Sequence, residues 1–259
     1  MISLCRDPYP SRAISDHLLA RRLEPVIWSE DSERPAWLNP EQAQQYADDG
    51  YLVLDDFLSR QQVIELLAAR SVCLDKQTVV RNLSQQHDAF AELSSSPKLL
   101  DLMRYLLAGD VYLHQSSAHA HATLKGQQQE WRSDFEIWHI EDGMPQMRAV
   151  QCFVVLDKPS RFHAPLQVLP GSHKTYVGRP NNELAQESIA MLSHQNGGEE
   201  ALEPMPGSLI VMDSNILHTS EGQHLAFAFN SLDNSLTKPA YGLAPRSEEL
   251  ATRTAPNPL

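Results

Sequence analysis

The stretch that decides the fold is Trp131-Arg132-Ser133-Asp134-Phe135-Glu136-Ile137-Trp138-His139-Ile140-Glu141-Asp142-Gly143-Met144. It places the carboxylate of Asp134 two residues after Arg132, and a distant histidine, His218, follows in Asp213-Ser214-Asn215-Ile216-Leu217-His218. A non-haem iron site is built from two histidines and one carboxylate, which leave the other metal positions open. Asp134 and His218 match two of these ligands, and Arg132 stands where a His-x-Asp pair would place the first histidine.

Further phrases surround this stretch. They are Asp7-Pro8-Tyr9-Pro10-Ser11-Arg12, Asp48-Asp49-Gly50-Tyr51-Leu52-Val53-Leu54, His114-Gln115-Ser116, Pro170-Gly171-Ser172-His173 and Asn230-Ser231. Together with the opening stretch, they resemble the ectoine hydroxylase branch of the phytanoyl-CoA dioxygenase family, most clearly over residues 107–242. The family signature reads Phe-x-Trp-His-Ser-Asp-Phe-Glu-Thr-Trp-His-x-Glu-Asp-Gly-Met, and the chain shares Trp131, Ser133, Asp134, Phe135, Glu136, Trp138, His139, Glu141, Asp142, Gly143 and Met144 with it. Such a resemblance indicates homology over most of the chain.

This resemblance implies a fold and a chemistry. The fold would be mainly β with flanking helices, a double-stranded β-helix of the jelly-roll, cupin-like kind. The cofactors would be Fe(II) and 2-oxoglutarate, and the partner a small-molecule substrate. Short apolar runs broken by turn residues favour an antiparallel double sheet independently, at 111–124, 147–157, 165–169, 207–213 and 224–233.

Length and charge restrict the classes of function. A chain of 259 residues is consistent with one domain over 1–259. The formal net charge is −12 and no basic run occurs, so a nucleic acid partner is not expected. No apolar window is long enough to span a membrane and no secretory apolar region occurs, which predicts a cytoplasmic protein. Three cysteines without paired spacing predict no disulfide framework or zinc site. The sequence leaves open whether the protein is a monomer or a homodimer.

The sequence also predicts the structure of segments outside the strands. Residues 1–40 lack periodicity, so we expect an extended N-terminal arm that wraps the surface. Ser59 begins one predicted helix with a capping box, and Pro97 lies in the first turn of another. Residues 181–203 are polar without an apolar period, which predicts a surface loop acting as a lid. We expect residues 246–259 to form a mobile tail.

Arg132 is the main departure from an iron site. A guanidinium stays protonated in proteins and offers no lone pair, so it cannot replace an imidazole ligand. Its charge also stands about where the charge of the iron would be. We therefore predict an ion pair between Arg132 and Asp134 that satisfies both groups without a metal. Arg132, Asp134 and His218 are the candidate catalytic residues.

Two histidines offer an alternative ligand. His119 and His121 are two residues apart in one predicted strand, so their side chains point to one face. Imidazole is a usual iron ligand, and either histidine could complete a set with Asp134 and His218. The alternative is that both are polar groups of the pocket wall.

The co-substrate and substrate positions also depart from the resemblance. In the family, an arginine after the distal histidine binds the far carboxylate of 2-oxoglutarate, whereas here the chain runs from His218 to Leu225 without arginine. Gln115 and Trp138 match residues of the ectoine pocket, but Ser117 stands where the family has an arginine. Ectoine is therefore not the expected substrate. We assign the substrate wall to Gln115, Ser117, His119, His121, Trp138 and Ser220.

Two classes of function remain. The first is a Fe(II)/2-oxoglutarate oxygenase with a remodelled ligand set that acts on a small polar metabolite. The second is a metal-independent descendant, either a cyclase- or isomerase-type catalyst or a small-molecule binding protein. The usual activity of the family favours the first class, and the residues at the site favour the second.

Overall fold

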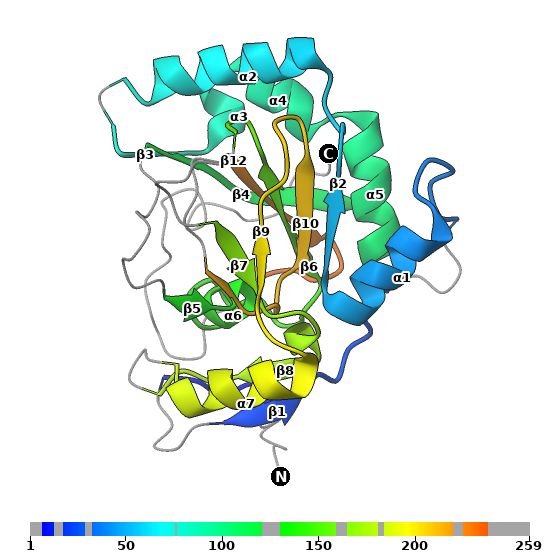
Figure 1. Cartoon of the computed structure of the whole chain (residues 1–259), viewed down its shortest axis with the longest axis vertical. Helices are drawn as coiled ribbons and strands as arrows, with labels where there is room; N and C mark the ends of the chain where they lie inside the picture. Colours follow the sequence, from blue (N-terminus) through cyan, green and yellow to red (C-terminus); the bar gives the residue numbers. More distant parts are fainter. Residues whose placement is uncertain are drawn as a thin grey trace.

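Two antiparallel sheets face one another in this structure (Figure 1). The computed structural model describes residues 7–12, 18–28, 33–75, 77–120, 130–158, 165–180, 184–219 and 225–237. The larger sheet has the order β2 (Tyr51–Leu54), β10 (Leu209–Asp213), β6 (Ala149–Val154), β12 (Leu225–Ser231), β4 (Val111–His119) and β3 (Val79–Arg81). The smaller sheet has the order β5 (Trp131–Arg132), β11 (His218–Thr219), β7 (Leu166–Val168) and β9 (Glu200–Leu202). This architecture confirms the expected double sheet.

The strand register separates two faces of the larger sheet. Phe153 on β6 is opposite both Ile210 on β10 and Ala226 on β12, so these three side chains share one face. They pack in one apolar cluster with Val168 of the smaller sheet. Alternate residues, such as Phe227, face the other way into a cluster shared with helices. Inward side chains of both sheets therefore meet between the sheets.

Helices cover the outer face of the larger sheet (Figure 1). They include α1 (Pro40–Asp49), α2 (Arg60–Cys73), α3 (Leu83–Gln86), α4 (Asp88–Ser94) and α5 (Pro97–Leu107). Ser59 caps α2 in a capping box with Gln62, as the sequence predicts. Helix α5 begins at Pro97 and buries six apolar side chains. Both predicted helices are therefore confirmed.

The signature stretch changes from strand to helix at Ser133. Strand β5 ends at Arg132, and helix α6 (Asp134–Asp142) begins two residues later. The Ser133 hydroxyl accepts a hydrogen bond of 3.2 Å from the Glu136 amide, which is a standard N-cap. Gly143 ends the helix with a φ of 75°, a conformation that glycine adopts readily. Arg132 and Asp134 therefore lie on different elements.

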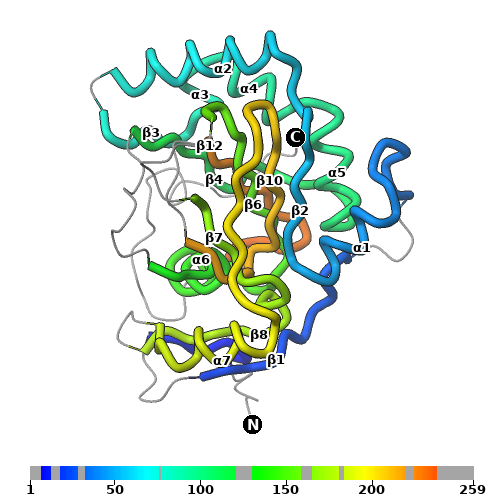
Figure 2. The backbone as a smooth tube through the Cα atoms, in the orientation of Figure 1, coloured from blue at the N-terminus to red at the C-terminus, as the bar shows by residue number. Residues whose placement is uncertain are grey.

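The N-terminal segment is built into the core. Strand β1 (Leu19–Arg21) pairs with β8 (Thr175–Val177), and Figure 2 shows the blue N-terminal segment beside this strand. The fully buried ring of Tyr9 lies 4.9 Å from that of Tyr176, centroid to centroid. The expectation that residues 1–40 wrap the surface is therefore wrong for this part of the segment, because strand pairing and aromatic packing bury it.

Residues 186–202 form regular structure where a loop was expected over 181–203. They contain helix α7 (Gln186–Asn196) and strand β9. Leu192 packs with Leu169, Val177 and Leu217. The loop prediction is therefore wrong, because a few apolar residues suffice to bury this polar helix on one side. A role as a lid stays a prediction, and the expected tail at 246–259 lies outside the described residues.

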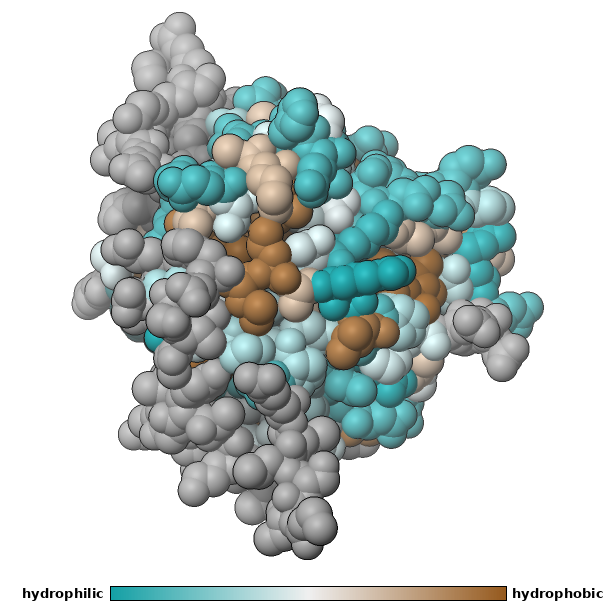
Figure 3. Space-filling view, turned by 90° about the horizontal axis from the view of Figure 1, so that it is seen from below, coloured by the Kyte–Doolittle hydropathy of each residue, from teal (hydrophilic) through white to brown (hydrophobic). Residues whose placement is uncertain are grey.

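The described surface offers few large apolar residues. On the side seen in Figure 3, polar residues cover most of the described surface and apolar ones gather in small areas. Scattered exposed apolar residues are ordinary on protein surfaces. Within the described ranges, no helix is both long and apolar enough to cross a membrane.

Candidate functional site

Arg132 and His218 lie side by side on the inner face of the smaller sheet. Strands β5 and β11 pair with Arg132 directly opposite His218, and Val168 of β7 flanks His218 on the other side. Opposed residues share a face, and Val168 packs between the two sheets. The ring of His218 lies 6.2 Å from that of Phe153, on the inner face of the larger sheet. Arg132 therefore lies on the face of its sheet that points inward.

Asp134 joins this pair from the first turn of α6. Its Oδ2 atom is 3.9 Å from Nε2 of His218, and the two side chains are 14% and 1% exposed. Both atoms are buried, and neither has a hydrogen-bond partner among the described residues. Within the described ranges His218 is the basic side chain that lies within 4 Å of the Asp134 carboxylate, and no ion pair joins Asp134 to Arg132, so the predicted ion pair with Arg132 is wrong. Arg132 ends strand β5 and Asp134 begins helix α6, so the two side chains leave the backbone from different elements.

The turn between β10 and β11 holds Asp134 and His218 near each other. The Ser214 carbonyl accepts a hydrogen bond of 2.7 Å from the amide of Phe135, which follows Asp134. The Ser133 hydroxyl donates to Oδ1 of Asn215 at 3.3 Å. The start of α6 is therefore fastened to the segment that leads to His218.

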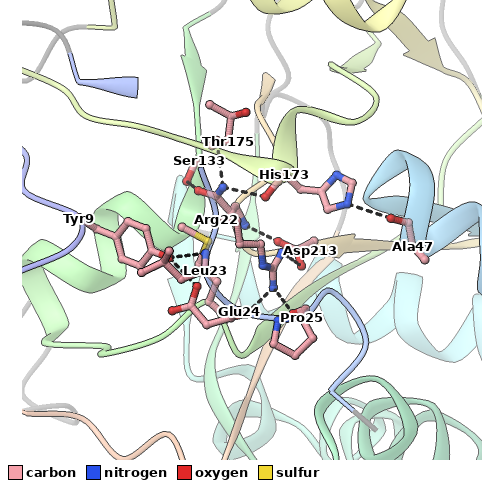
Figure 4. Close-up of polar contacts among 12 residues, drawn as sticks. Tyr9, Arg22, Leu23, Glu24, Pro25, Ala47, Ser133, His173, Thr175 and Asp213 are labelled. Carbon is pink, nitrogen blue, oxygen red and sulfur yellow. Dashed lines mark hydrogen bonds and ion pairs between the residues drawn. The ribbon is translucent and has the colours of Figure 1, made fainter. Parts of the chain in front are cut away.

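A buried ion pair supports the same turn. Arg22 donates to Oδ2 of Asp213 at 2.6 Å and to two backbone carbonyls at 3.0 and 2.7 Å (Figure 4). Oδ1 of Asp213 accepts from the Asn215 amide at 2.8 Å. The Asn215 side chain donates to the carbonyls of His173 and Thr175 at 3.0 and 3.1 Å. The N-terminal segment thus stabilises the turn before His218.

His218 presents a lone pair toward Asp134. Its Nδ1 lies 3.1 Å from the Ile216 carbonyl, an acceptor, so Nδ1 carries the proton of the neutral ring. Burial lowers the pKa of His218, which Asp134 opposes and Arg132 reinforces. The neutral ring therefore offers Nε2 as an acceptor, a metal ligand or a base.

The described residues do not fit a complete iron site. Asp134 and His218 supply two ligand atoms, and no group of three histidines, cysteines or carboxylates suited to a metal occurs in the described ranges. Arg132 has no lone pair to donate. His119 ends β4 opposite Val79, is exposed, and is not gathered with the pair. His121 lies outside the described residues.

The predicted substrate wall is partly assembled. Ala226 is opposite Ser117 and Ala228 is opposite Gln115, which places both polar residues on the inner face of the larger sheet. Trp138, in contrast, is 1% exposed and packs in a core cluster, with its ring 5.2 Å from that of His114. The structure therefore places Trp138 in the core rather than on an open wall. Ser220 lies outside the described residues.

Sequence reasoning missed several supporting residues. Asn215 lies in Asp213-Ser214-Asn215, three residues that favour turns, and this pattern could have predicted a turn stabilised by side chains before His218. Arg22 gave no signal, because its partner is 191 residues away along the chain. Gln151, opposite Ala228 on the inner face, was also missed; its Oε1 is buried without a hydrogen-bond partner.

A family model and a curated relative both match most of the chain. The family model described as phytanoyl-CoA dioxygenase (PhyH) matches residues 38–224. Ectoine dioxygenase from Sphingopyxis alaskensis is 35% identical over 294 aligned residues, covering 98% of the chain and 95% of that relative. Because the alignment is longer than the 259 residues of the chain, this relative has segments that the chain lacks.

Solved structures give the same result. EctD from S. alaskensis with bound Fe superposes with a TM-score of 0.86 at 34% identity, covering 98% of the chain and 97% of that protein. The same enzyme with 2-oxoglutarate and 5-hydroxyectoine also gives 0.86 at 34% identity, covering 97% and 96%. The predicted double-stranded β-helix is thereby confirmed. With a family match over most of its length and a 35% identical relative along nearly all of it, the chain belongs to the phytanoyl-CoA dioxygenase family.

Proposed function

We propose that this chain is a divergent family member that works without iron and 2-oxoglutarate and uses the space between its sheets for a small polar metabolite. The observation that carries the proposal is the position of Arg132, directly opposite His218 on the inner face. A guanidinium there supplies a positive charge in place of a ligand lone pair. The site is therefore suited to binding, or to acid–base chemistry, without a metal.

The loss of the co-substrate anchor supports this proposal. A buried carboxylate is held best by a bidentate arginine, and the segment from His218 to Leu225 has none. The loss of one charged hydrogen-bonding partner weakens binding by about 1.5–3 kcal/mol, which is a factor of roughly ten to a hundred. Binding of 2-oxoglutarate would therefore be weak even if a metal were present.

The groups at the site define the chemistry available without a metal. Asp134 and Nε2 of His218 can accept a proton, and Arg132 can stabilise a developing negative charge. Gln115 and Gln151 bring amide groups to the inner face on either side of Ala228. These groups suit a cyclase- or isomerase-type reaction, or the binding of a small polar molecule. Ser117, where the family has an arginine, argues against ectoine.

A second candidate keeps the oxygenase chemistry. Oδ2 of Asp134 and Nε2 of His218 are both without hydrogen-bond partners, as ligand atoms awaiting a metal would be. Because His119 is exposed and is not gathered with this pair, His121 would have to supply the third ligand. Changing His121 to alanine should then abolish iron binding, with His119→Ala as the control, and unchanged iron content in the His121 variant would exclude this candidate.

The test is metal analysis combined with turnover. We expect protein purified without oxygen to retain far less than one equivalent of iron after dialysis, because two ligands remain and Arg132 repels the cation. We also expect no oxygen consumption or succinate release with Fe(II) and 2-oxoglutarate. Stoichiometric iron with coupled succinate release would restore the oxygenase function.

A further inference from the structure

Oδ2 of Asp134 and Nε2 of His218 are two buried acceptors that receive no hydrogen bond from the part of the chain that the structure describes. They lie 3.9 Å apart, so one nitrogen at about 2.9 Å from each atom could donate to both. Resting on the metal-free function proposed above, we propose that these acceptors bind a cationic nitrogen of the ligand, a primary ammonium or an amidinium group. Its N–H groups would stand where a metal-dependent relative needs its cation.

No donor among the described residues satisfies either atom. Nδ1 of His218 donates to the Ile216 carbonyl, so Nε2 of the neutral ring has only a lone pair. An ionised carboxylate is an acceptor as well, and two facing acceptors cannot satisfy one another. Most buried polar atoms in native structures have a hydrogen-bond partner, so two unpaired atoms that face one another require an explanation such as a bound group.

A singly charged nitrogen suits this position better than a divalent metal. Arg132 lies opposite His218, and its Coulomb repulsion acts twice as strongly on a dication as on a monocation at the same point. A metal also requires a third protein ligand, whereas an N–H cation requires only acceptors. The Arg132 charge therefore selects against iron more than against ammonium.

A charged donor suits Asp134 better than a neutral one. The Asp134 side chain is only 14% exposed, and His218, its neighbour at 3.9 Å, makes no hydrogen bond with its Oδ2 atom. A carboxylate in such a place is compensated best by a positive charge that also donates a hydrogen bond, because charge-assisted hydrogen bonds are the stronger ones.

Three small probes separate charge from hydrogen bonding. Methylammonium has both a charge and N–H donors, tetramethylammonium has the charge alone, and acetamide has donors without the charge. Each is titrated into the full-length, iron-free, ¹⁵N-labelled protein, and the His218 ring nitrogens and the Phe135 amide are followed by NMR. We expect saturable shifts with methylammonium, and binding weaker by about tenfold or more with the other two.

Variants of Asp134 and Arg132 test whether the charges of these side chains control methylammonium binding. Asp134→Asn should weaken methylammonium binding by about tenfold or more, whereas Asp101→Asn, whose side chain is 58% exposed on α5, should leave it unchanged. Arg132→Gln removes the opposing charge without touching either acceptor and should tighten binding. This gain remains measurable if Asp134→Asn fails to fold.

Several results would overturn the inference. They are equal affinity for methylammonium and tetramethylammonium, equal affinity for acetamide, unchanged affinity in Asp134→Asn, or weaker affinity in Arg132→Gln. The outcome is distinguishable from failure of the proposed function. Iron retention by the parent protein would contradict the metal-free function, whereas iron-free protein that ignores methylammonium would contradict this inference alone.

Discussion

Replacing Asp213 by alanine should be among the most destabilising single changes in this protein. Asp213 and Arg22 form a salt bridge of 2.6 Å, with side chains 2% and 3% exposed. Asp213→Ala leaves the guanidinium buried without its carboxylate and removes the acceptor of the Asn215 amide. Breaking one side of a buried pair costs about 3–5 kcal/mol. At about 2–4 °C per kcal/mol for a chain near this size, the melting temperature should fall by roughly 6–20 °C.

A matched surface pair provides the control. Asp157 accepts two hydrogen bonds from Arg70 but is 41% exposed, so Asp157→Ala should cost about 1 kcal/mol or less. Free energies of unfolding from urea titrations of both variants and the parent give the comparison. Replacing Arg22 and Asp213 together by Met and Leu should cost less than Asp213→Ala alone, because no lone charge is then buried. Equal losses in the Asp213 and Asp157 variants would refute the assignment of a buried, uncompensated charge.

Three further predictions concern the site and the residues that support it. The Arg132→His variant should stay folded and bind Fe(II) more tightly than the parent, because it restores a His-x-Asp pair beside His218. It should still not turn over 2-oxoglutarate, and an unchanged Fe(II) affinity by metal titration would mean that residues 132, 134 and 218 do not converge on a metal. Gly50→Ala should cost about 1–3 kcal/mol more than Gly109→Ala, since both have positive φ but only the Gly50 Cβ would meet His173, 2.3 Å from Nδ1; equal urea midpoints would contradict this. Burial lowers the pKa of His173 to about 4, so the contribution of this ring to stability is present above its unfolded pKa of about 6.5 and is lost as pH falls toward about 4. The His173→Gln variant should therefore lose less free energy of unfolding than the parent between these pH values. An equal pH dependence of the free energy of unfolding in both proteins would contradict this prediction.

The sequence predicts those parts of the fold whose signals are local. Pro97 followed by an apolar helical period was enough for α5, and the runs at 149–154 and 225–231 were enough for two strands. Helix α7 was not predicted because it buries few apolar side chains, such as Ile189 and Leu192, and the surrounding residues are polar. The burial of Tyr9 was missed because its partners lie far along the chain.

The candidate site could likewise be predicted only in part from the sequence. The approach of Asp134 and His218 followed from the signature, because both positions match the family. The expected Arg132–Asp134 ion pair was wrong, because spacing alone does not reveal that a strand ends at Arg132 and that Ser133 caps a helix. The Arg22–Asp213 pair had no signal, since a contact across 191 residues leaves no local pattern.

Contacts with backbone carbonyls hold the segments that carry Asp134 and His218. The Phe135 amide bonds to the Ser214 carbonyl, and Nδ1 of His218 bonds to the Ile216 carbonyl. None of these contacts uses Oδ2 of Asp134 or Nε2 of His218, which are left unpaired. A change at residue 132 therefore alters the charge and the ligand set of the site without removing what holds the pair in place. For this reason substitutions of Arg132 report on the chemistry of the site, whereas substitutions of Asp213 report on its support.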